Sequence, residues 1–299
     1  MKKTEEGTFT RLPASVKGAI WMTLSAVFFA AQAAIVRHLS NDLHFVEISF
    51  FRALFGIVIM LPWLMRVGSN TLRTSNTKLY VWRGFLGTIA MYGWFGGLAL
   101  VPLADATAIS FTFPLFIALA GVLFLKERAH LSRWIALFIG FAGTIIVIRP
   151  GFQDINIGVF MVIGGGVCIA VSAMILKITV RRDTPDQAAL YQAIYMLPFS
   201  LIVTLFVWQW PTMEQWFWGF ILGAASTTGQ RLYSRAFATG DVGSLAPFDF
   251  SRLPFAIALG FVFFSELPDF WTILGGTIIF SSSIFAGRSE TRRRKKSKT

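Results

Sequence analysis

The chain has 299 residues, of which 55% are hydrophobic and only 14% charged, and its formal net charge is +12. A soluble domain usually carries about 25% charged residues, so this composition excludes an ordinary soluble protein and indicates one that lies in lipid. The basic residues gather between apolar segments, which argues against binding to nucleic acid.

Long apolar segments follow one another along nearly the whole chain. Almost every window of about 20 residues is apolar enough to cross a bilayer as a helix, whereas barrel strands would be about 10 residues of alternating pattern. We therefore expect an all-α integral membrane protein with ten transmembrane helices. They cover residues 18–36, 45–65, 79–100, 103–124, 132–148, 156–177, 186–207, 215–238, 243–264 and 268–286.

The basic residues that flank these segments alternate in a way that supports the count. If the amino terminus is cytoplasmic, only Arg37 and Arg149 of these flanking residues fall on the outer side, as the positive-inside rule requires. In this count Arg83 belongs to the cytoplasmic flank of the third span. Both termini are then cytoplasmic, and the basic tail is expected to contact anionic lipid.

An internal repeat divides the chain. The run 98–114 resembles the run 237–254, so that Pro114 aligns with Pro254. Five spans per half is an odd number, so the second half should enter the membrane from the opposite side, and inverted repeats of this kind serve alternating access in transporters. The expected organisation is a segment 1–17, a first five-helix repeat 18–150, a second 151–287 and a tail 288–299.

Several short motifs carry a resemblance to a known family. The first half holds Pro-Leu-Ala-Asp-Ala-Thr-Ala-Ile at 102–109, Leu-Lys-Glu-Arg at 125–128, Gly-Phe-Ala-Gly at 140–143 and Arg-Pro-Gly at 149–151, and the second holds Phe-Phe-Ser-Glu at 263–266 before Gly-Gly at 275–276. Together they resemble the EamA-type domain of the drug/metabolite transporter superfamily. The resemblance implies a multi-pass secondary carrier in a bacterial inner membrane.

The cargo is less specific than the fold. The aromatic residues make the chain most similar to bacterial exporters of amino acids, including aromatic ones, so export of amino acids with broad specificity is the leading expectation. Similar chains take up riboflavin or S-adenosylmethionine, and uptake of a vitamin or nucleotide-like metabolite is the alternative.

Other classes fit the sequence less well. A membrane-embedded enzyme is disfavoured because there is no catalytic constellation, and the lack of a nucleotide-binding motif excludes an ATP-driven pump within this chain. We expect no cofactor, no metal site and no nucleic-acid partner. The partners are a small-molecule substrate and the bilayer, and ten spans can form a complete carrier as a monomer.

Polar side chains inside the spans are the candidates for substrate contact, because such groups are costly in lipid. Glutamine and tyrosine can hydrogen-bond a zwitterion while aromatic faces pack a ring, although hydrogen bonds between helices explain any one of them as well. The candidate substrate-binding residues are Gln32, Tyr92, Trp94, Tyr191, Gln192, Tyr195, Ser226, Thr228 and Gln230.

Charged residues and prolines in the spans form a second set. Arg52 could hold a structural partner or a substrate carboxylate, and Asp249 and Arg252 are three apart on one helix face, where they can pair or act in coupling. Pro114 and Pro254 lie at equivalent places and are candidate hinges, since each removes a backbone hydrogen bond, or they merely kink the helices.

Overall fold

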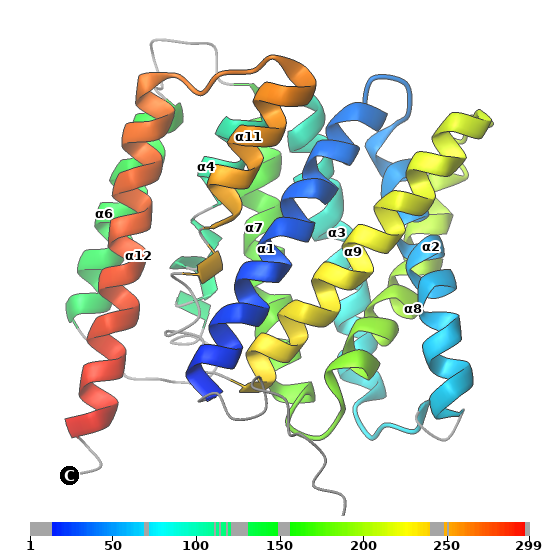
Figure 1. The fold of residues 1–299 in the computed structure, drawn as a ribbon, viewed down its shortest axis with the longest axis horizontal. Helices are drawn as coiled ribbons and strands as arrows, with labels where there is room; N and C mark the ends of the chain where they lie inside the picture. The colour runs from blue at the N-terminus through cyan, green and yellow to red at the C-terminus, as the bar shows by residue number, and fades with distance from the viewer. Residues whose placement is uncertain are drawn as a thin grey trace, which may run out of the picture.

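The structure is a computed structural model, and it describes residues 14–68, 72–110, 112–113, 115–117, 119–120, 131–148, 156–239, 248–249 and 251–296. Within these residues the regular structure is helical and there is no strand (Figure 1). Helices are expected in lipid because they satisfy every backbone hydrogen bond internally. The helices are α1 (Ala14–Leu39), α2 (Phe45–Val67), α3 (Thr77–Leu100), α4 (Leu103–Ser110), α6 (Leu131–Ile148), α7 (Ile157–Thr179), α8 (Pro185–Thr204), α9 (Met213–Thr239), α11 (Arg252–Phe264) and α12 (Phe270–Lys296).

Four of the described helices are long and apolar enough to cross a membrane by themselves, namely α1, α2, α7 and α8. The described residues also include shorter apolar helices in the segments 105–117, 254–264 and 270–282. Glycine, aromatic residues and one buried arginine lower the mean hydropathy of helices such as α3. The chain is thus a multi-pass membrane protein, while the count of ten spans and the side of the termini stay predictions.

The ends of three helices meet at one end of the bundle. Arg37, near the end of α1, donates from Nη1 to the Leu98 carbonyl near the end of α3 at 2.9 Å. Asn156, directly before α7, donates from Nδ2 to the Leu100 carbonyl at 2.9 Å. Because α1 ends where α7 begins, these two helices run in opposite directions (Figure 1).

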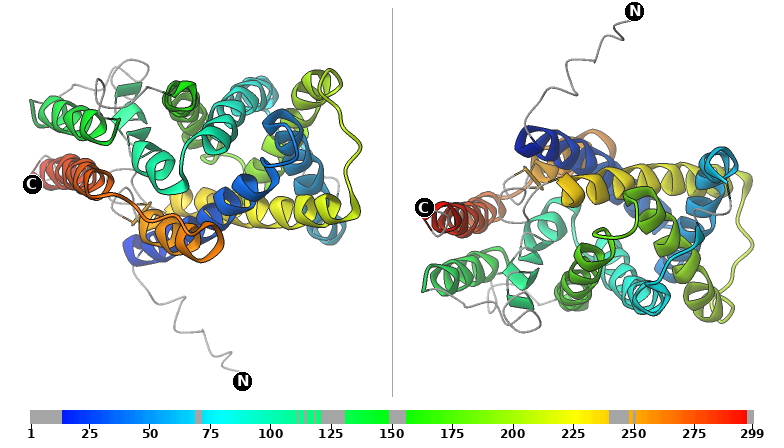
Figure 2. Two further views of the ribbon diagram at one scale, coloured as in Figure 1. Left: turned by 90° about the horizontal axis from the view of Figure 1, so that it is seen from above. Right: turned by 90° about the horizontal axis from the view of Figure 1, so that it is seen from below.

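The helices pack in pairs that join the two parts of the chain. Helix α3 packs on α7, α1 on α9, α2 on α8 and α9, and α6 on α12 at one side of the molecule (Figure 2). If α1, α2 and α3 are exchanged with α7, α8 and α9, the pair α1 with α9 becomes α7 with α3. The packing scheme is therefore unchanged when the two sets of helices are exchanged.

Equivalent helix pairs are nevertheless in contact through different atoms. A Cβ added to Gly93 of α3 would lie 2.5 Å from the Met161 carbonyl oxygen and 2.8 Å from the Gly165 Cα of α7, so here two backbones touch. In the α1–α9 pair, a Cβ on Gly229 would lie 3.0 Å from the Phe29 ring, which is a side chain. Small residues permit such close approach between membrane helices.

A group of polar contacts joins α1, α3, α4 and the segment before α12. Arg37 forms an ion pair with Glu266 at 3.2 Å and also donates to the Ala99 carbonyl at 3.0 Å. The other carboxylate oxygen of Glu266 accepts the backbone N–H of Leu103 at 2.9 Å, and this N–H belongs to the first residue of α4. We call Arg37, Glu266 and the Leu98, Ala99 and Leu103 backbone groups the Arg37 cluster.

The opposite end of the bundle, where α7 ends, has acidic residues at its centre. Asp183 accepts from the Thr74 hydroxyl at 2.9 Å, which links the α7–α8 turn to the segment before α3. Asp186, in the first turn of α8, pairs with Arg231 at 2.7 Å and with Arg235 at 3.2 Å, both from α9. A carboxylate in the first turn also suits the positive end of the α8 dipole.

Candidate functional site

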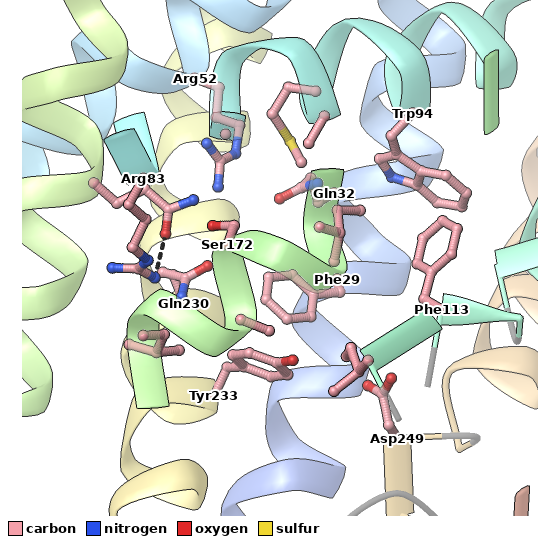
Figure 3. Close-up of a pocket in the computed structure, with 18 of the residues that line it drawn as sticks. Phe29, Gln32, Arg52, Arg83, Trp94, Phe113, Ser172, Gln230, Tyr233 and Asp249 are labelled. Atoms are coloured by element: carbon pink, nitrogen blue, oxygen red, sulfur yellow. Dashed lines mark hydrogen bonds between the residues drawn. The ribbon is translucent and has the colours of Figure 1, made fainter. Parts of the chain in front are cut away.

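A pocket lies between α1, α2, α3, α7, α8 and α9, with residues at the start of α11 and Phe113 completing its wall (Figure 3). The empty space within it is about 880 Å³, including space continuous with the outside. Pockets that bind small molecules combine apolar walls with a few placed polar groups. Its polar and charged lining residues are Gln32, Arg52, Arg83, Ser172, Gln192, Gln230, Tyr233, Asp249 and Arg252.

Equivalent positions of the two halves contribute to this pocket together. Gln32 of α1 and Ser172 of α7 both line it, as do Arg52 of α2 and Gln192 of α8, and each pair is separated by the same number of residues as Pro114 and Pro254. Helices α2 and α8 both begin with a side-chain N-cap, which places Arg52 and Gln192 at the same turn. The repeat seen in the sequence thus converges on one cavity.

Arg83 lines this pocket. This finding corrects its assignment to the cytoplasmic flank of the third span. It is only 2% exposed. Its guanidinium donates from Nη1 to the Ala188 carbonyl at 2.7 Å and from Nη2 to Gln192 Oε1 at 2.6 Å. A charge count along the sequence misplaced it because Arg83 lies on the buried face of α3, which packs on α8.

Arg52 is likewise buried, with 7% of its surface exposed, and lines the pocket as Figure 3 shows. The hydrogen bond that the structure gives it runs from Nη1 to the Met196 sulfur at 3.3 Å, and a thioether is a weak acceptor. Within the described residues its Nε has no hydrogen-bond partner. Arg52 therefore faces the cavity instead of snorkelling to the membrane surface.

The predicted pairing of Asp249 with Arg252 is present. The Arg252 Nη2 donates to Asp249 Oδ1 at 2.6 Å, as residues three apart on one helix face can do. The Arg252 guanidinium also lies over the Phe29 ring, 5.0 Å from its centroid, which is a cation–π distance. Both charges of this pair line the pocket but neutralise one another.

Aromatic rings form the remaining wall. Trp94 and Phe113 meet edge to face with centroids 5.9 Å apart, and Phe29 meets Tyr233 in the same way at 5.9 Å. In Figure 3, Arg52 and Arg83 lie on one side of the pocket, and Trp94 and Phe113 lie on the other. The pocket can therefore hold a molecule with a polar or charged part and a flat apolar part.

Of the nine candidates for substrate contact, Gln32, Trp94, Gln192 and Gln230 line this pocket. Tyr191 lies outside its lining: it stacks on Tyr80 at 4.7 Å and its hydroxyl donates to the Leu72 carbonyl. Tyr195 stacks on Tyr191 at 5.9 Å. These tyrosines belong to a separate aromatic cluster near the end of the bundle that holds Asp183.

The other candidates also lie outside the lining. The Tyr92 hydroxyl donates to the Ser200 carbonyl at 3.4 Å. Ser226 is buried, and its hydroxyl has no partner among the residues described, while Thr228 is half-buried. Pro254 lies in the first turn of α11, where a proline costs little, and Pro114 lies outside the described residues.

Sequence reasoning missed four lining residues with evident chemistry, Phe29, Arg83, Phe113 and Tyr233. The three aromatic residues carry no signal among 31 phenylalanines and several tyrosines in an apolar chain. For Arg83 a signal existed, since it falls inside the predicted span 79–100. An ionisable residue inside a span is a functional candidate by default.

Comparison with known proteins identifies the family. The sequence profile of the EamA-like transporter family matches this chain twice, over residues 16–149 and 156–288. The chain belongs to the EamA-like transporter family. One solved crystal structure, 17% identical, superposes on this EamA-like chain with a TM-score of 0.68 over 92% of it and 98% of the solved chain, which shows a shared fold.

Relatives of this EamA-like chain are named as transporters of several compounds. It is 31% identical to the S-adenosylmethionine uptake transporter of Rickettsia bellii, over 91% of this chain and 94% of the relative. It is 29% identical to the riboflavin transporter of Vibrio cholerae, over 93% and 95%, and 27% identical to the pseudopaline exporter CntI of Pseudomonas aeruginosa, over 91% and 96%. The first two names favour the alternative, uptake of a vitamin or nucleotide-like metabolite, over the leading expectation of amino-acid export.

Proposed function

We propose that this chain is an uptake carrier for a water-soluble metabolite that joins a flat ring system to a polar part, of the kind represented by S-adenosylmethionine and riboflavin. The observation that carries the proposal is the pocket itself, which sets aromatic rings opposite polar and cationic groups. Aromatic side chains favour flat rings through stacking or edge contacts. The relatives named for these two compounds support the same class.

The mechanism that we propose is alternating access by two inverted five-helix repeats, in a bacterial inner membrane. The opposite directions of α1 and α7 and the exchange symmetry of the helix pairs support it. In such carriers the site lies between the repeats, and each repeat can adopt the conformation of the other. A pocket lined by equivalent residues of both halves is the site that this mechanism needs.

The direct test is transport in proteoliposomes that contain the purified chain. Labelled S-adenosylmethionine, riboflavin and phenylalanine are each supplied outside, with protein-free vesicles as the control. We expect saturable accumulation of at least one ring-bearing metabolite. Flux of phenylalanine with none of the other two would overturn the proposal and restore amino-acid transport as the function.

The direction of transport needs whole cells. We expect expression of this chain to let a bacterium that cannot make riboflavin grow on a low external supply, or to let one that cannot make S-adenosylmethionine do so. A vector without the gene and the Arg52→Gln variant are the controls. Growth equal to that of the empty vector in both strains would contradict uptake.

A further inference from the structure

The two most deeply buried arginines of the described chain, Arg83 and Arg52, have no carboxylate partner among the described residues. Arg37, Arg231, Arg235 and Arg252 each pair with Glu266, Asp186 or Asp249. In the part of the chain that the structure describes, neither Arg52 nor Arg83 makes an ion pair. A buried cation without a partner is unfavourable by several kcal/mol, so a fold retains it only where something else compensates its charge.

The hydrogen bonds of Arg52 and Arg83 compensate only part of the cost of burying their positive charges. A guanidinium has five N–H donors. Arg83 uses two of its nitrogens on neutral acceptors, the Ala188 carbonyl and the Gln192 side chain, and Arg52 uses one on the Met196 sulfur. The Nε atoms of both arginines are buried and without a partner among the described residues.

Helix α8 holds the two arginines next to one another. Their acceptors Gln192 and Met196 are four residues apart, one turn of the same helix face. Both guanidinium groups line the same pocket, and like charges at one site repel each other. An anion placed between them would interact favourably with both and remove that repulsion.

The carboxylate of Asp249 does not supply this anion. It is the acidic residue that lines the pocket, and it is bound to Arg252 at 2.6 Å. Figure 3 shows Asp249 beside Phe113, on the side of the pocket away from Arg83. Among the described residues, no carboxylate neutralises Arg52 or Arg83, so both can bind an anion from outside the protein.

We propose that the substrate carries an oxyanion, a carboxylate or a phosphate, which Arg52 and Arg83 bind while its ring packs against Trp94 and Phe113. The inference rests on the proposed function, since it names the group by which that same pocket would recognise its cargo. Arginine forks bind carboxylate and phosphate through paired hydrogen bonds, and such bonds are stronger than those between neutral groups.

The first experiment needs no variant, because it compares ligands that differ in the oxyanion. S-adenosylhomocysteine is paired with its methyl ester, which lacks the carboxylate charge, and riboflavin 5′-phosphate is paired with riboflavin. Binding of each compound to the full-length parent is measured by microcalorimetry in detergent. We expect the oxyanion-bearing member of one pair to bind about tenfold or more tightly than its partner. The pair that responds distinguishes carboxylate from phosphate.

The second experiment assigns the effect to the two arginines. Arg52→Gln and Arg83→Gln should each weaken binding of the preferred oxyanion compound by about tenfold or more. Each variant should have little effect on binding of the paired compound that lacks the oxyanion. The matched control is Arg66→Gln, which removes one exposed cation from the same helix as Arg52. Arg52→Lys should recover part of the loss, since it restores the charge but not the fork.

The outcomes separate this inference from the proposed function. If neither pair of compounds shows a difference in affinity, the arginines do not select an anion, although the carrier proposal stands. If Arg66→Gln weakens binding as much as Arg52→Gln, the effect is one of net charge and the assignment is wrong. If none of the four compounds binds the folded parent, both the inference and the proposed substrate class are refuted.

Discussion

The two halves of this carrier share a scaffold but contribute different chemistry to the pocket. The first half supplies the unpaired cations Arg52 and Arg83, and the second supplies the neutral Gln192 at the position equivalent to Arg52. The position equivalent to Arg83 is Gly223, where an added Cβ would lie 2.3 Å from the Phe55 Cβ. Repetition can therefore provide the motion of alternating access, while departures from repetition provide the specificity of the site.

The largest effect is expected on folding stability, where two glycine variants test whether the equivalent helix pairs are packed unequally. Gly93→Ala should destabilise the folded protein by about 2 kcal/mol or more, because the new methyl group meets the α7 backbone, which cannot move without separating the helices. Gly229→Ala should have a smaller effect, since the Phe29 ring can shift. Thermal unfolding in detergent measures both variants. Equal losses would show that the α3–α7 contact is no tighter than its counterpart.

Gln192 of the second half is the neutral hydrogen-bond partner of Arg83 in the first half. Gln192→Leu removes the acceptor of the Arg83 Nη2, so we expect transport to fall by about tenfold as the guanidinium loses its fixed position. Gln230→Leu is the matched control, because this amide also lines the pocket but makes no hydrogen bond to Arg83. A similar loss in both would mean that pocket polarity, not the position of Arg83, matters.

A smaller effect is expected at the ion pair of the second half. Asp249→Asn and Arg252→Gln, made singly and together, should show a coupling of about 1 kcal/mol in unfolding free energy, since the two side chains are only partly buried, at 23% and 14% exposed. Transport should change by only about threefold in each case, because these charges already neutralise one another. If Asp249→Asn alone abolishes the response to an imposed pH gradient, the pair takes part in proton coupling.

The smallest effect is expected at the prolines. Pro254→Ala and Pro114→Ala should each slow transport by about twofold to threefold with unchanged binding, if both act as hinges in equivalent helices. Transport rate and substrate affinity are measured separately in proteoliposomes. Parental rates in both variants would remove the hinge hypothesis.

The fold could be predicted from the sequence because hydropathy and repetition act over many residues. The multi-pass helical character followed from such averages, the family from short motifs in both halves, and the Asp249–Arg252 pair from its spacing. The positions of single side chains around a helix could not be predicted in this way. Tyr191 and Tyr195 share a face by spacing, but that face meets Tyr80, while Gln192, a third of a turn away, reaches the pocket.

Arg83 shows why the site was harder to find than the fold. The positive-inside rule weighs only the number of basic residues near a span end, and a buried arginine in the first turns counts there like an exposed one. Only packing distinguishes the buried arginine from an exposed one, since the Ala188 carbonyl and the Gln192 side chain of α8 accept hydrogen bonds from the Arg83 guanidinium. Such acceptors come from a helix more than 100 residues away in the chain.

The Arg37 cluster joins four segments of the chain at one end of the bundle. One guanidinium and one carboxylate join α1, α3, α4 and the segment before α12 through contacts of 2.9–3.2 Å, so any movement that separates α1 from α3 there breaks several of them at once. We expect such a cluster to separate in one step and not by gradual loosening, which would limit leakage of ions through partly open states. In a cell that depends on its membrane potential, this property would matter as much as the affinity for the cargo.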